Sequence, residues 1–170
     1  MKKRKAVMDT SFWSCAVHTG VHGYLDELFE APVWVPRKVD REILKQDNAP
    51  VGRIYPYQKE YEIHKESGRF QVKEAREPLE HLDGGENEAI ALAQEEEAGL
   101  LINESRGYEY GRNEADIFCI NVPFFIFVIA RYELLGVKAA KKRIRSCTPV
   151  TSESYINDAL DAVKILEEDD

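Results

Sequence analysis

Short apolar runs alternate with longer apolar repeats along most of this chain. Four segments are apolar runs of the length expected for buried strands: residues 5–9, 33–35, 100–102 and 117–120. Apolar residues recur at helical spacing over 10–29, 89–93, 123–135 and 152–166. Strands that alternate with helices through short links are typical of a parallel sheet covered on both faces. The sequence therefore predicts a three-layer α/β/α sandwich with a central parallel sheet, in one domain over residues 1–170 that includes C-terminal helices at about 123–166.

The stretch from Leu82 to Glu104 contains the clearest helix–strand unit. Asp83 stands three residues before Glu86, the spacing of a capping box at a helix start. Gly99 is a residue type that ends helices, and the next three residues form a short apolar strand. A carboxylate at a helix start and another just past a strand lie at the same edge of a parallel sheet. That edge is where α/β proteins place their sites.

Two parts of the chain are less regular. Asn and Pro with Gly mark a loop within 47–56, followed by a helix over 58–67 and an edge strand over 70–72. Residues 105–115 are interrupted by glycine and rich in Tyr and Arg, which predicts loop with some helix. Pro36 is predicted to start a helix that runs to about Gln46.

Four acidic residues fall near strand ends or on the helices beside them: Asp9, Glu42, Glu86 and Glu104. Like charges brought together at one edge of a sheet are unfavourable unless a cation neutralises them. Hard oxygen ligands without accompanying His or Cys favour Mg²⁺ or Mn²⁺. Such a cluster is typical of metal-assisted phosphodiester hydrolysis.

Several segments, in their order and spacing, resemble the PIN-domain family. They are VMDTS at 7–11, VWVPRKVDREI at 33–43, GGENEAIALA at 84–93, LLINES at 100–105 and NVPFFIFVIARYELLGV at 121–137. The third segment is closest to the subgroup with the pattern GE-x-EAI-x-LA. The resemblance implies a metal-dependent ribonuclease with an acidic triad or quartet, acting on RNA. It also implies a homodimer and, as in many members, the toxin of a toxin–antitoxin pair with an antitoxin protein as partner.

The family's acids match three positions here: Asp9, Glu42 and Glu86. After the LLI strand the subgroup usually carries an acidic pair, but this chain has Asn103 followed by Glu104. The predicted catalytic residues are therefore Asp9, Glu42, Glu86 and Glu104, and the predicted metal ligands are Asp9, Glu86, Asn103 and Glu104. Because Asn103 contributes no charge, a catalytically impaired module that binds RNA or protein remains the alternative to an active endoribonuclease.

Three further residues near the acidic edge are candidate contacts for substrate: Ser11, Arg106 and Arg112. The basic run 138–145 is a candidate surface for an RNA backbone, or a solvated helix flank. The acids also have simpler structural interpretations: Asp9, for example, is a suitable cap for the next helix. Two other chemistries are weaker: zinc bound by Cys15, His18 and His22 on one helix face, and phosphoryl transfer through Asp9.

Composition and charge limit the partners and the compartment that this chain can be expected to have. The net charge is −8, so the chain has no general attraction for nucleic acid and would need a local basic patch or metal ions. The longest apolar run, 122–130, is far short of a membrane span, and no signal-peptide core follows the basic start. Three widely spaced cysteines fit a reducing compartment. We therefore expect a cytoplasmic protein that does not engage a membrane.

Overall fold

The computed structural model of this chain describes residues 3–44, 55–77, 79, 84–148 and 150–168. Within these ranges, five parallel strands form one sheet in the order β3-β2-β1-β4-β5. The strands are β1 (Ala6–Met8), β2 (Val33–Pro36), β3 (Phe70–Lys73), β4 (Gly99–Leu101) and β5 (Cys119–Ile120). Strand order reverses between β1 and β4, so the crevice outside their carboxyl ends is the expected place for a site.

Successive residues of β1 face opposite sides of the sheet. Ala6 and Met8 belong to one apolar core, whereas Val7 belongs to the other. The side chains of β1 are fully buried on both faces because β1 lies in the middle of the sheet, between β2 and β4. The period of two along a strand thus divides the sequence between two layers of helices.

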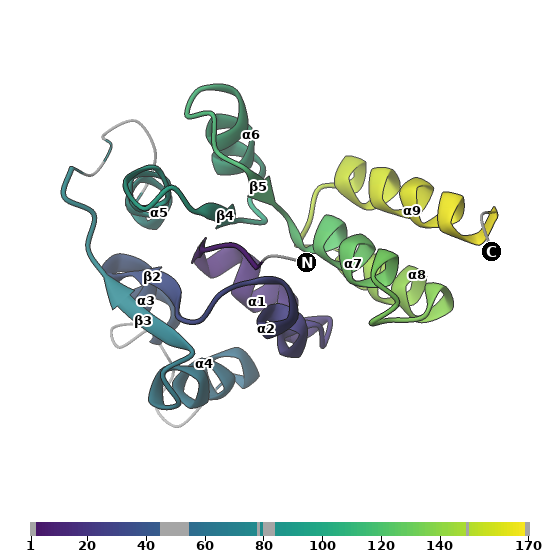
Figure 1. Cartoon of the computed structure of the whole chain (residues 1–170), viewed down its shortest axis with the longest axis horizontal. Helices are drawn as coiled ribbons and strands as arrows, with labels where there is room; N and C mark the ends of the chain where they lie inside the picture. The colour runs from purple at the N-terminus through teal and green to yellow at the C-terminus, as the bar shows by residue number, and fades with distance from the viewer. Residues whose placement is uncertain (1–2, 45–54, 78, 80–83, 149, 169–170) are drawn as a thin grey trace.

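Helices cover both faces of the sheet. The larger core receives side chains from α1 (Thr10–His18), α2 (Leu25–Leu28), α3 (Arg37–Leu44), α4 (Pro56–Glu66) and α7 (Val122–Arg131). The smaller core is closed by α5 (Gly84–Glu95) and α6 (Ser105–Asn113). Figure 1 shows α5 and α6 on one side of β4 and β5, with α1 and α2 on the other. The three-layer α/β/α prediction is confirmed.

The last helices pack together beside the sheet. α8 (Val137–Arg145) and α9 (Glu153–Glu168) lie against α7 (Figure 1). A short 3-10 turn, η1 (His22–Tyr24), joins α1 to α2. No helix within the described residues is long and apolar enough to cross a membrane.

The structure corrects three predictions made from the sequence. Residues 105–113 form helix α6 rather than mainly loop. Pro36 ends β2 instead of starting the following helix. The predicted helix 123–135 stops at Arg131, because the chain turns there with Glu133 at φ 59°. The predicted capping role of Asp83 lies outside the described residues.

Candidate metal-dependent active site

The four predicted acids line one cavity at the carboxyl edge of the sheet. Asp9 follows β1, Glu42 lies on α3, Glu86 is in the first turn of α5, and Glu104 precedes α6. The cavity has a volume of about 340 Å³ and is lined by Asp9, Thr10, Ser11, Glu42, Gly84, Gly85, Glu86 and Glu104. Four separate chain segments therefore bring carboxylates to the point where strand order reverses.

Asp9 is buried and held by the residue two positions on. Its Oδ2 accepts hydrogen bonds from the backbone N–H of Ser11 at 3.1 Å and from the Ser11 hydroxyl at 2.7 Å. Burial raises the pKa of Asp9, and the nearby charge of Glu42 adds to this, although the Ser11 hydrogen bonds oppose it. Asp9 thus caps α1 as the simpler reading of the sequence expected, and it also lies in a region of concentrated negative charge.

Ser11 joins the ends of two neighbouring strands. Besides donating to Asp9, its Oγ accepts the backbone N–H groups of Asn103 at 3.0 Å and Glu104 at 3.2 Å. These bonds fix the segment after β4 against the segment after β1. The hydroxyl is therefore engaged by the protein itself, and the contact of Ser11 with substrate stays a prediction.

Glu42 is oriented by a residue that the sequence reasoning did not single out. The hydroxyl of Thr10 donates to Glu42 Oε2 at 2.7 Å. On the other side, a Cβ added to Gly85 would lie 2.8 and 2.9 Å from the two Glu42 oxygens. The Gly84-Gly85 pair is therefore more than a turn, because the carboxylate of Glu42 fills the space that a side chain at 85 would need.

Replacing Gly85 by Ala is expected to displace the Glu42 carboxylate. We expect a reaction that uses Glu42 to slow about 10- to 100-fold, because small misplacements of reacting groups have effects of that size. The free energy of unfolding should change by less than about 1 kcal/mol, since alanine favours a helix and the displaced group is a flexible side-chain end. Gly23→Ala is the control, because a Cβ at Gly23 meets nothing within 4 Å. Kinetics and chemical unfolding of both variants measure the two effects, and unchanged activity in Gly85→Ala would contradict the assignment of Glu42.

The pKa values of the neighbouring Glu86 and Glu104 carboxyls are shifted in opposite directions. Glu104 caps α6, with Oε1 accepting from Arg106 N–H at 3.0 Å and Oε2 accepting from Gly107 N–H at 2.8 Å. Burial opposes ionisation of Glu104, but these backbone bonds prevail and lower its pKa. Burial, the charge of Glu104 and a hydrogen bond with that carboxyl raise the pKa of Glu86 to about 8. Without a cation, the pair therefore holds one proton near neutral pH, mainly on Glu86.

Asn103 is buried and points to other parts of the fold. Its Nδ2 donates to the Thr151 hydroxyl at 2.7 Å and to the Val150 carbonyl at 3.4 Å. Its Oδ1 accepts the backbone N–H of Val122 at 3.1 Å. The side chain thus ties the end of β4 to the start of α7 and to the segment before α9. Asn103 is not among the residues that line the acidic cavity, and its role as a metal ligand stays a prediction.

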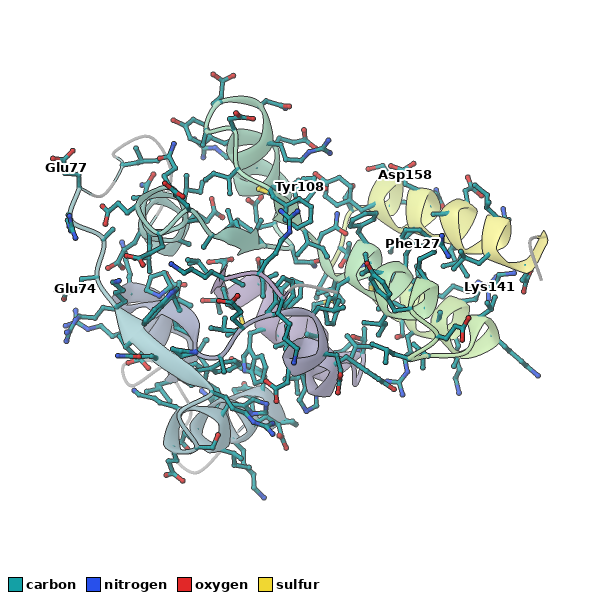
Figure 2. All side chains as sticks on the ribbon, in the orientation of Figure 1. Glu74, Glu77, Tyr108, Phe127, Lys141 and Asp158 are labelled. Carbon is teal, nitrogen blue, oxygen red and sulfur yellow. The ribbon has the colours of Figure 1, made fainter. Side chains whose placement is uncertain are left out.

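The two predicted arginines lie in different surroundings. Arg106 is exposed in the first turn of α6, and its charge reaches both Glu86 and Glu104. The Arg112 guanidinium lies over the Tyr108 ring, 5.6 Å from its centroid, and lines a separate hollow of about 850 Å³. Tyr108, labelled in Figure 2, contacts Tyr155 of α9, with the ring centroids 5.0 Å apart. The structure therefore brings Arg106, but not Arg112, beside the acidic cavity.

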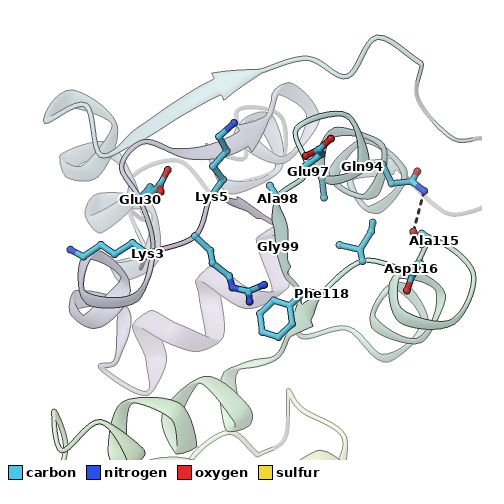
Figure 3. A pocket seen from close by; sticks show the side chains of 13 residues that line it. Lys3, Lys5, Glu30, Gln94, Glu97, Ala98, Gly99, Ala115, Asp116 and Phe118 are labelled. Carbon is cyan, nitrogen blue, oxygen red and sulfur yellow. Dashed lines mark hydrogen bonds between the residues drawn. The ribbon is translucent and has the colours of Figure 1, made fainter. Parts of the chain in front are cut away.

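Two larger hollows among the described residues are not lined by these four acids. One of about 780 Å³ lies at the opposite ends of the strands and is lined by Lys3, Lys5 and Phe118 together with Glu30, Glu97 and Asp116 (Figure 3). Its charges are of both signs, and Arg4 packs over the Phe118 ring. The smaller acidic cavity is the better candidate for chemistry, since it combines four carboxylates, a raised pKa and a strand-order reversal.

The donor set of the acidic cavity fits a hard divalent cation by type. Carboxylate oxygens are the ligands that Mg²⁺ and Mn²⁺ prefer, and a cation would relieve the charge repulsion that adds to burial in raising the pKa of Glu86. In their present rotamers, however, no three or more His, Cys, Asp and Glu side chains of the described ranges close into a metal-binding group. This also leaves the zinc alternative unsupported: Cys15 instead contacts the Thr151 hydroxyl and His22 lies 3.6 Å from Glu60.

Comparison with known families agrees with this geometry. The family model DUF3368, described as a PIN domain, matches residues 5–142. The matched range includes all four acids and every strand of the sheet, and it stops before α9. No curated protein matches the chain.

Proposed function

Since this chain belongs to the PIN-domain family, whose members are generally nucleases, we propose that it is a metal-dependent endoribonuclease. One observation carries the proposal most directly: four carboxylates from four chain segments line a single cavity at the carboxyl edge of β1 and β4. Mg²⁺ or Mn²⁺, when bound, neutralises the phosphate and lowers the pKa of a water molecule. The reaction is hydrolysis of an RNA phosphodiester.

Each acid has a distinct part in the proposed reaction. Asp9, Glu86 and Glu104 would hold the cation, and Glu86 would then be ionised, although its raised pKa favours the protonated form in the metal-free protein. Glu42, oriented by Thr10, accepts a proton from the attacking water. Asn103 and Ser11 act by fixing the segment that carries Glu104 against Asp9.

The proposal is tested by incubating purified protein with structured RNAs in Mn²⁺, and in parallel with EDTA. We expect internal cleavage that requires the metal and that is absent with EDTA. Cleavage that persists in EDTA, or an absence of cleavage with every RNA in Mn²⁺ and in Mg²⁺, would count against a metal-dependent endoribonuclease. Analysis of the product ends separates endonucleolytic cleavage from trimming.

The proposal extends to a toxin that acts in the cytoplasm, forms a homodimer and is held inactive by an antitoxin protein. Its support is the family resemblance and the apolar surface of α7, where Phe124 is 37% exposed and contacts Phe127. Co-expression with a candidate antitoxin that restores growth, together with sedimentation of the purified chain, tests these two parts separately.

The second candidate function is a PIN-like module that binds RNA or protein without cleaving, and Asn103 is the observation that favours it. Replacing Asn103 by Asp restores the charge that the family usually carries there. A carboxylate at this position cannot donate to Val150, and it would face that carbonyl at close range. We therefore expect Asn103→Asp to lose about 1–3 kcal/mol of stability without any gain in cleavage.

Asn121→Asp is the matched control. Asn121 is equally buried but uses its Oδ1 to cap α7 through the Phe124 N–H, a position that favours aspartate. It should keep its stability in chemical unfolding. A large gain in cleavage by Asn103→Asp would instead show that the native site is impaired, and would favour the non-catalytic module.

A further inference from the structure

Lys38 lies at the edge of the acidic cavity and belongs to none of the residues discussed so far. It is the second residue of α3, and its side chain runs along Gly84. A Cβ added to Gly84 would lie 2.9 Å from Lys38 Cε, 3.0 Å from Lys38 Nζ and 3.4 Å from Glu42 Oε1. Gly84 itself lines the cavity, so the ammonium group and the Glu42 carboxylate border the same glycine.

The backbone holds Lys38 in this place. Its N–H donates to Glu88 Oε2 at 2.9 Å, which joins the first turn of α3 to α5. Gly84 has φ 49°, a conformation that residues with a side chain rarely adopt. The backbone therefore favours glycine at this position, and the space that a side chain would fill stays open. The stem of Lys38 occupies that space and carries its charge to the cavity.

The charge of Lys38 is not neutralised by an ion pair in the part of the chain that the structure describes. Neighbouring basic residues differ: Arg37 pairs with Glu74, and Lys65 pairs with Asp40 at 2.8 Å. Lys38 is exposed, and no carboxylate of the described residues lies within 4 Å of its ammonium nitrogen. An exposed cation beside Glu42, at the edge of a cavity lined by four carboxylates, remains available to an anion from solvent.

We propose that Lys38 binds a non-bridging phosphate oxygen of the RNA backbone where the strand enters the acidic cavity. This inference rests on the proposed function and adds a substrate-binding residue to it. A phosphodiester approaching four carboxylates meets repulsion, and an ammonium group at the rim offsets this through a charge-assisted hydrogen bond. Lysine suits a backbone contact because it acts as a point charge that does not depend on base identity.

The test compares Lys38→Met with wild-type protein in two assays. The first is binding of a short fluorescent single-stranded RNA in Ca²⁺, measured over a range of salt concentrations. We expect a Kd about 10-fold higher in Lys38→Met and a salt slope shallower by about 0.7, the value for one phosphate contact on a single strand. The second is cleavage in Mn²⁺, where KM should rise by a similar factor while kcat changes little.

Two further variants separate this role from a structural one. Arg37→Met removes an equal charge one residue away and should change neither Kd nor the salt slope, because that guanidinium pairs with Glu74. Lys38→Arg keeps the charge and should restore most of the slope. Melting temperatures of all variants show that they fold.

Equal salt slopes in Lys38→Met and wild-type protein would overturn the inference. Failure of the wild-type protein to cleave, with binding retained, would overturn the ribonuclease proposal while the slope still decides the role of Lys38. Failure of the wild-type protein to bind RNA at all would overturn both.

Discussion

Asp9→Asn is expected to lose cleavage activity by roughly 10²–10³-fold or more, the scale of removing one well-placed electrostatic group from an active site. Asp9 is the most buried of the four carboxylates, and its charge interacts with those of Glu42 and Glu86. Its charge attracts the cation directly, so asparagine removes the property on which the proposed chemistry depends. The rate of RNA cleavage in Mn²⁺ measures the loss.

The same substitution should leave the fold intact. Asparagine is as good a helix cap as aspartate, and its carbonyl oxygen can still accept from the Ser11 N–H and hydroxyl. Asp161→Asn is the matched control, because Asp161 is exposed on α9 and pairs with Lys164 three residues on. We expect the control to cleave as the wild-type protein does. Equal cleavage by Asp9→Asn and the wild-type protein would remove Asp9 from the active site and with it the PIN-type mechanism.

The sheet and the acidic edge were predictable because they depend on patterns that the sequence states directly. Ala6 to Met8 and Gly99 to Leu101 are apolar at every position, which is what a central strand buried on both faces requires. Asp9 and Glu104 follow these two strands closely, and parallel neighbours end at the same edge. Their shared cavity then follows from topology alone.

The sequence predicts loop with some helix over 105–115 because glycine disfavours a helix, whereas the structure forms the continuous helix α6. Gly107 and Gly111 are instead needed where α6 packs closely on the sheet. A Cβ at Gly107 would lie 2.5 Å from Ile102 Cδ1, and one at Gly111 would lie 2.6 Å from Cys119 Sγ. Glycine lowers helix propensity in either case, so the spacing of residues along the chain does not distinguish a break from a close approach.

The surroundings of Asn103 and Lys38 could not be predicted for a different reason. The partners of the Asn103 side chain, Thr151 and Val122, come from segments that are far away in the sequence. Lys38 likewise meets Gly84 only because α3 packs against α5. Such contacts depend on how helices pack on the finished sheet, and a sequence pattern records only that each residue type is compatible with its helix.

Glu86→Gln is expected to abolish cleavage and, at the same time, to stabilise the metal-free protein at alkaline pH. The pKa of Glu86 is raised to about 8 in the folded state by burial, Glu104 and Asp9. The unfolded chain has the ordinary value near 4.5, so between these two values the folded state binds more protons than the unfolded state. The free energy of unfolding therefore falls as pH rises through this window. The loss arises because the folded state must give up the proton on Glu86.

Glutamine removes this loss because it stays neutral at every pH. In EDTA, we expect Glu86→Gln and wild-type protein to be similarly stable at about pH 5, and the variant to be more stable by about 1–2 kcal/mol at about pH 9. That figure is smaller than the full pKa shift would give, because water reaches part of the Glu86 carboxyl.

Glu97→Gln is the control, because Glu97 is an exposed carboxylate just past the other end of α5. Its stability should follow the wild-type curve throughout. A stability difference between Glu86→Gln and wild-type protein that does not grow with pH would contradict the shared proton. A growing difference that Mn²⁺ abolishes would tie the same carboxyl to cation binding, because a bound cation stabilises the ionised wild-type pair but not the amide.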